Sequence, residues 1–87
     1  MKIPHSFQLM GSVWKVEEVS ALPVLGETHR DLLTIRLRKE SPKQVKETTF
    51  CHELFHCFFF QLGMTDHSEE KVDVLGALLH QYLETAK

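Results

Sequence analysis

Two different spacings of hydrophobic residues divide the chain. In the first 40 residues, apolar and polar positions alternate over Phe7–Val19 and again over Leu32–Arg38. Alternation with a period of two is typical of strands that bury one face. We therefore predict one or two strands over 7–19 with a bend at Gly11-Ser12, another strand over 32–38, and a turn or loop over Ala21–Arg30, which contains a proline and a glycine.

After residue 40 the pattern becomes that of helices. Ser41 and Pro42 predict a helix start, with the serine as N-cap and the proline at the first helical position. No helix-breaking residue follows until Gly63, which we expect to cap the end of a helix over 41–62. Its apolar residues lie on almost every side, as expected of a central buried helix. They are Phe50, Leu54, Phe55, Phe58, Phe59, Phe60 and Leu62.

A second helix is predicted over 67–85. Ser68 is its expected N-cap, and the acidic residues of its first turn suit the helix dipole. Its apolar stripe consists of Val72, Leu75, Leu78, Leu79 and Tyr82. Strands followed by two helices predict one α+β domain over 1–87, with a small antiparallel sheet in residues 1–40.

Composition limits what such a domain can do. With 87 residues, of which 43% are hydrophobic, it can bury a modest core and offer only a shallow cleft. The net charge of −2 gives no electrostatic reason to expect a nucleic-acid partner, and we interpret the short basic cluster at 36–39 as strand edge or solvated surface. Because the chain has neither a long apolar run nor a signal-peptide pattern, we expect a cytoplasmic protein without a membrane partner.

The two cysteines, Cys51 and Cys57, fall on the first helix. Six residues of helix separate them by about 9 Å, which is beyond the reach of a disulfide. We expect both thiols to be reduced and buried.

The motif H-E-x-x-H lies in the middle of the first helix and consists of His52, Glu53 and His56. Histidines four residues apart share one face of a helix, so both can bind one Zn²⁺ at about 2.0–2.1 Å. Glu53 is rotated by about 100° from His52 and can contact a water on the metal without binding the metal itself. Because these polar groups would be costly among apolar residues without partners, the context favours two zinc ligands and a general base.

Catalytic zinc sites commonly have three protein ligands and a water. On the second helix, Glu69 and Asp73 lie on the flank beside the apolar stripe, whereas Glu70 points away from it. We choose Glu69 as the third ligand, and Asp73 and His67 are the alternatives. His80 lies roughly 16 Å further along the helix than Glu69, so these two cannot share one ion.

These residues resemble the zinc-binding motifs of gluzincin metallopeptidases. His52-Glu-Leu-Phe-His56 is followed by residues 69–77, which are similar to the gluzincin helix pattern E-x-x-A-D-x-F-A-A, with Val72, Leu75 and Gly76 replacing alanine, phenylalanine and alanine. The compact chain and the strand before the metal helix also resemble small zincin-like proteins of bacteriophages and, more distantly, the ImmA/IrrE group.

The resemblance implies a minimal zincin-like fold in which Glu69 is the third zinc ligand. It also implies that Asp73 accepts a hydrogen bond from a ligand histidine and that Glu53 is the general base. Gluzincins usually supply a tyrosine or histidine that stabilises the oxyanion. Tyr82, His80 and His5 are the candidates for that role, and the sequence favours none of them.

The predicted function is zinc-dependent peptide hydrolysis in a bacterial or phage-infected cell. Zinc lowers the pKa of its bound water towards about 7, Glu53 takes the proton, the hydroxide attacks the carbonyl, and Glu53 returns the proton to the leaving amine. The strand Thr34–Arg38, directly before the metal helix, is either the edge that pairs with an extended peptide or merely one wall of the sheet.

The alternative is a non-catalytic, zinc-stabilised interaction module, such as a phage protein that binds a host partner. Small domains often depend on a metal for stability. A structural site would close the fourth metal position with His67 or a cysteine, whereas a catalytic site leaves that position to water. Since Phe58, Phe59 and Phe60 cannot all face one small core, they indicate a homodimer contact or a partner surface.

Overall fold

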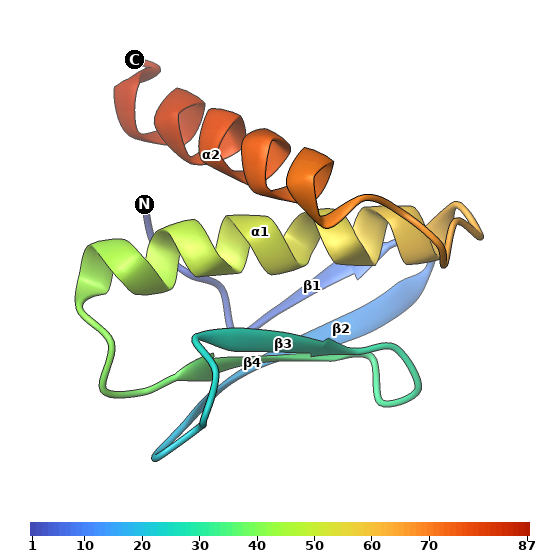
Figure 1. Ribbon diagram of the computed structural model, residues 1–87, viewed down its shortest axis with the longest axis horizontal. Coiled ribbons are helices and arrows are strands. Elements are labelled where there is room, and N and C mark those ends of the chain that lie inside the picture. The colour runs from blue at the N-terminus through green and yellow to red at the C-terminus, as the bar shows by residue number, and fades with distance from the viewer.

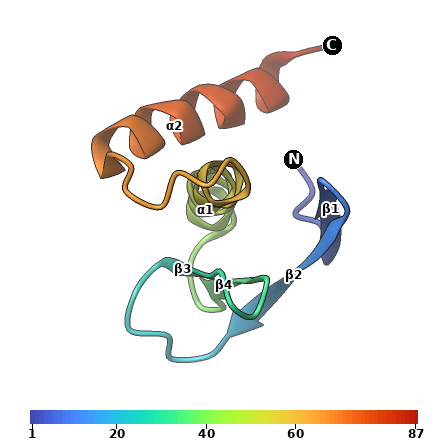
Figure 2. The ribbon, with the colours of Figure 1, turned by 90° about the vertical axis from the view of Figure 1, so that its right-hand side faces the viewer.

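A sheet, a helix on one of its faces and a second helix on top of the first form three layers (Figures 1 and 2). The computed structural model describes residues 1–87. Its elements are β1 (Ser6–Leu9), β2 (Ser12–Val19), β3 (Gly26–His29), β4 (Thr34–Arg38), α1 (Lys43–Gln61) and α2 (Glu69–Thr85). The predicted α+β order, strands followed by two helices, is confirmed. Neither helix combines the length and apolarity that a membrane span requires.

The sheet is mixed, with the strand order β1-β2-β4-β3. The hairpins β1–β2 and β3–β4 are antiparallel, as expected, but the central strands β2 and β4 run parallel, with Val16 opposite Ile35. The chain after β2 passes to the far edge before forming β3, and β4 then returns into the middle of the sheet. This return makes the central pair parallel.

Strand β3 lies within the segment 21–30 that was predicted as a turn or loop, so that prediction is wrong for Gly26–His29. Its sequence, Gly-Glu-Thr-His, has little intrinsic strand propensity. Pairing with β4, in which Thr28 lies opposite Ile35, overrides this weak local preference. The missed strand matters because β3 is the edge strand nearest the motif helix.

The hydrophobic core lies between the sheet and α1. Trp14, Ile35 and Leu37 point from the sheet towards Phe50 and the two cysteines of α1, and all six are buried. Full burial of a side chain such as Ile35 or Leu37 stabilises the fold by about 1.5–3 kcal/mol. Both cysteines are free and buried, as predicted. Burial raises the pKa of the Cys51 thiol to about 11 and that of the Cys57 thiol to about 12.

The start of α1 differs from the prediction by one residue. Pro42 is the N-cap and the helix begins at Lys43, so Ser41 is not the cap. Pro42 has ψ 154°, which is extended backbone, so the first residue in helical conformation is Lys43. No side chain caps this end of the helix.

The end of α1 is closed by Gly63, as predicted. Gly63 has φ +76°, its N–H donates to the carbonyl of Phe60 at 3.0 Å, and the N–H of Met64 donates to the carbonyl of Phe59 at 2.8 Å. This pair of bonds is a Schellman motif, which glycine favours because the left-handed conformation has no steric cost for it. The motif folds the chain sharply back at residue 64.

Helix α2 packs on α1 through a narrow face. Ser68 caps its start, as predicted, and accepts a hydrogen bond from the N–H of Lys71 at 3.3 Å. The buried residues are Val72, Gly76 and His80, and a Cβ built on Gly76 would lie 2.9 Å from the backbone N and Cα of His52. Glycine thus allows the two helices to approach closely at the H-E-x-x-H motif.

The predicted apolar stripe of α2 is wrong in part. Leu78 and Tyr82 are 57% and 65% exposed. Helix α2 packs mainly on α1, so its opposite side faces solvent (Figure 2), and these apolar side chains lie there.

Candidate metal centre

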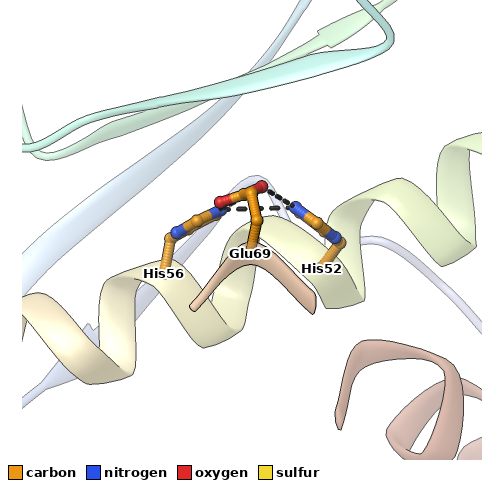
Figure 3. Close-up of side chains that lie close together, drawn as sticks. All are labelled: His52, His56 and Glu69. Atoms are coloured by element: carbon orange, nitrogen blue, oxygen red, sulfur yellow. Dashed lines mark hydrogen bonds and ion pairs between the residues drawn. The ribbon is translucent and has the colours of Figure 1, made fainter. Parts of the chain in front are cut away.

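The side chains of His52 and His56 meet Glu69 where the start of α2 crosses α1 (Figure 3). Nε2 of His52 is 3.3 Å from Nε2 of His56 and 3.0 Å from Oε1 of Glu69. Nε2 of His56 is 3.0 Å from the other oxygen of Glu69. Three atoms that can bind a metal therefore lie next to one another.

Their spacing fits zinc. Four ligand atoms at about 2.0–2.1 Å from a tetrahedral Zn²⁺ are about 3.3 Å apart. The observed separations of 3.0–3.3 Å differ little from that value. Two imidazoles and one carboxylate are also a ligand set found at catalytic zinc. Little movement of these side chains is needed for them to hold the ion.

Glu69 brings a negative charge to the candidate metal centre. Desolvation by the neighbouring residues alone would raise its pKa, but His56 and His52 beside it outweigh this effect and lower the pKa below its usual value. The carboxylate therefore stays ionised through the neutral pH range, as a metal ligand must be.

Asp73 lies one turn after Glu69, on the same side of α2, and contacts the other nitrogen of His52. Nδ1 of His52 is 2.8 Å from Oδ1 of Asp73. The carboxylate attracts a proton to this nitrogen, which leaves Nε2, the nitrogen that faces Glu69, as the one to bind a metal. The structure thus brings Asp73 to the outer side of the His52 ring and not among the three ligand atoms.

Glu53 points from α1 towards β3. Its side chain is almost completely buried, and its Oε1 accepts a hydrogen bond from Oγ1 of Thr28 at 2.7 Å. Its other oxygen, Oε2, lies 3.9 Å from Nε2 of His52 and thus beside the ligand atoms. Sequence reasoning missed Thr28, because this residue lies in the segment expected to be a loop and no local pattern relates it to the motif.

His67, one of the alternative third ligands, does not lie among the ligand atoms. Its Nε2 is 2.6 Å from Nδ1 of His56, which is the nitrogen on the other side of the His56 ring from Glu69. Both cysteines are in the core and protonated at neutral pH. Neither His67 nor a thiol closes the fourth metal position in this arrangement.

An open cavity of about 810 Å³ lies beside the centre, between the β3 edge and α2. Its lining includes His52, Glu53, Glu69 and Asp73, together with residues 23–26 before and in β3. The three residues considered for the oxyanion, Tyr82, His80 and His5, do not line it. His80 is instead buried at the other end of α2, and Tyr82 is on its exposed side.

The edge of the sheet beside this cavity is β3. Strand β4, Thr34–Arg38, pairs with β2 on one side and β3 on the other. Of its two interpretations, the peptide-binding edge is therefore wrong, and the strand is part of the wall of the sheet. The backbone N–H of Arg38 donates to the backbone carbonyl of Leu25, so Leu25 and Arg38 form a hydrogen-bonded pair of the ladder. Since such pairs alternate along an antiparallel ladder, the N–H and C=O of Gly26 and Thr28 point outward, along the free edge.

A second cluster of histidine and glutamate was not anticipated. Glu47 of α1 lies beside His80 and Glu84 of α2, with Oε1 of Glu47 3.1 Å from Nε2 of His80. The α-amine of Met1 donates to both carboxylates, at 3.3 Å in the case of Glu47. The hydrogen bond from His80 is the largest of the contacts that together lower the pKa of Glu47 to about 2.

Comparison with protein-family models, with curated proteins and with solved structures gives no match to this chain.

Proposed function

We propose that this protein is a zinc-dependent metallopeptidase. The observation that supports the proposal best is the open side of the ligand cluster. His52, His56 and Glu69 supply three ligand atoms at zinc spacing, and the buried carboxylate of Glu53 stands beside them at the edge of a cavity. A site with three protein ligands, an open position and a neighbouring carboxylate is the arrangement of hydrolytic zinc.

The residues of the chain have separate tasks in this proposal. Zinc, when bound, supplies the acidity that activates a water and the positive charge that polarises a carbonyl. Glu53 accepts the proton of the attacking water and gives it to the leaving amine. Thr28 holds one oxygen of Glu53, so the other oxygen keeps its direction towards the ligand atoms.

The proposed substrate is an extended peptide segment. The free edge of β3 offers outward backbone groups at Gly26 and Thr28, and it forms one wall of the cavity. A peptide that adds to this edge as a further strand would gain backbone hydrogen bonds with little dependence on its sequence. The same residue, Thr28, would then contact both the peptide backbone and the base.

The first test is native mass spectrometry after zinc loading and desalting, followed by a cleavage assay with a quenched fluorescent peptide mixture. We expect one zinc per chain for the wild type and for Glu53→Gln. Cleavage should fall by at least about 10²-fold in Glu53→Gln, because this variant loses a general base and keeps the ligands. Absence of bound zinc, or equal cleavage by both proteins, would contradict the proposal.

A zinc-stabilised interaction module is the second candidate, and the exposed side of α2 favours it. Val74, Leu78 and Tyr82 lie at helical spacing and are 55%, 57% and 65% exposed. Such a row of apolar side chains is typical of a surface that binds another protein. The Glu53→Gln variant separates the two functions, because a binding module would keep its partner affinity and show no cleavage in either form.

A further inference from the structure

His67 lies in the connection between the helices and contacts the back of the His56 ring. Nδ1 of His67 is 2.7 Å from the carbonyl oxygen of Met64. A carbonyl oxygen can only accept a hydrogen bond, so Nδ1 of His67 carries a proton. In the neutral ring the opposite nitrogen, Nε2, is therefore an acceptor.

This acceptor determines where the proton of His56 lies. Nε2 of His67 is 2.6 Å from Nδ1 of His56, which must then donate its proton to it. With Nδ1 engaged by His67, Nε2 of His56 is the nitrogen available to a metal, and this is the atom that faces Glu69 and His52. The hydrogen bond from His56 to His67 thus prepares the correct nitrogen for the metal.

The position of His67 is held from several sides. Its ring stacks on Phe59, with centroids 4.9 Å apart and planes 21° from parallel, and meets the edge of Phe60 at 5.4 Å. The Met64 carbonyl that orients it follows directly on the left-handed turn at Gly63. The phenylalanines that suggested a partner surface in the sequence thus include two that pack around this histidine.

We infer that His67 is a positioning residue of the metal centre, which accepts a hydrogen bond from His56 and keeps Nε2 of His56 free to bind zinc. The inference rests on the proposed zinc site and deepens it. Nδ1 of His52 instead contacts the carboxylate of Asp73, so the two ligand histidines have unlike partners, a carboxylate and an imidazole. Partners of this kind orient ligand rings and strengthen metal binding.

The test compares two substitutions of His67. His67→Phe keeps an aromatic ring against Phe59 but cannot accept a hydrogen bond, and His67→Gln has an amide oxygen that can. Zinc affinity, measured by competition with a chromophoric chelator, should fall by about 10- to 100-fold in His67→Phe and recover in part in His67→Gln. The matched control is His5→Phe, at an exposed histidine outside the cavity, which should leave the affinity unchanged.

A second measurement uses the metal-free protein. Nitrogen-15 NMR of the imidazole rings shows which nitrogen of each histidine carries the proton. We expect a proton on Nδ1 of His56 in the wild type and a lower proton occupancy of Nδ1 in His67→Phe, an effect that loss of packing alone would not produce. An unchanged His56 spectrum in His67→Phe would overturn the inference.

The outcomes separate this inference from the proposed function. A wild type that binds no zinc would remove the proposed peptidase, and the NMR experiment would still decide whether His67 orients His56. A wild type that binds zinc, with equal affinity in His67→Phe, would overturn only the role of His67. If Co²⁺ absorption shows that His67→Phe loses a nitrogen ligand, His67 binds the metal itself and the inference is wrong.

Discussion

The interface of α1 and α2 contains two clusters of histidine and glutamate that differ in what they leave free. His52, His56 and Glu69 lie where the start of α2 crosses α1, and their ligand atoms face one another. At the other end of α2, Glu47 and Glu84 already contact His80 and the α-amine of Met1.

The difference follows from the partners of the histidines. In the first cluster the outer ring nitrogens of His52 and His56 face Asp73 and His67, so their Nε2 atoms converge on the Glu69 carboxylate. In the second cluster His80 donates inward to Glu47, and each carboxylate accepts from a neighbouring donor. Residue types that are almost the same thus produce an open ligand set in one place and a closed hydrogen-bond network in the other.

The most direct test of the difference between the clusters is to remove one histidine from each. His56→Ala should lower zinc affinity by more than about 100-fold, beyond the loss typical of an outer partner, because it deletes a ligand. His80→Ala, the matched control, should keep one zinc per chain. Chelator competition and native mass spectrometry measure both variants. Zinc loss in His80→Ala alone would mean that the ion binds at the other cluster.

Gly76→Ala tests whether the close helix contact forms the first cluster. The added Cβ would meet the backbone of His52 at 2.9 Å, so we expect a loss of about 1–3 kcal/mol in the free energy of unfolding and a weaker zinc site. An ordinary helix position would instead gain about 0.5–1 kcal/mol from this change. Urea unfolding of Gly76→Ala and of the exposed control Gln81→Ala gives the sign, and a more stable Gly76→Ala protein would refute the close contact.

Glu47→Gln tests the closed network through pH. The pKa of Glu47 is about 2 in the folded chain, against an ordinary value of 4.5. A lowered pKa stabilises the fold above the unfolded value, and this contribution disappears as the pH falls through the folded value. Glu47→Gln should therefore be less stable than the wild type near neutral pH, with the difference shrinking between pH 4.5 and about 2.

Chemical unfolding at several pH values measures this effect. The control is Glu70→Gln, on the solvent side of α2, which should follow the wild-type profile. A constant difference between Glu47→Gln and the wild type over this range would argue against the His80–Glu47 hydrogen bond as its origin.

Much of the candidate site could be predicted because its parts are local. The i, i+4 spacing of His52 and His56 places both rings on one face of any helix, and helix caps such as Gly63 and Ser68 depend on a few neighbouring residues. The choice of Glu69 used only angles along a helix. The ligand role of these residues stays a prediction until the metal is measured.

The sequence by itself therefore determined the two helices, their order after the strands and the shared helix face of His52 and His56, and it favoured Glu69 over Asp73 and His67 as their partner. Tertiary structure alone decided that β3 is the free edge, that Thr28 holds Glu53, and that His67 supports His56 from behind. The physical reason is distance along the chain. Helix geometry repeats within a few residues, whereas strand pairing and contacts between distant side chains depend on how the whole chain packs, and weak local signals such as those of Gly26–His29 cannot reveal them.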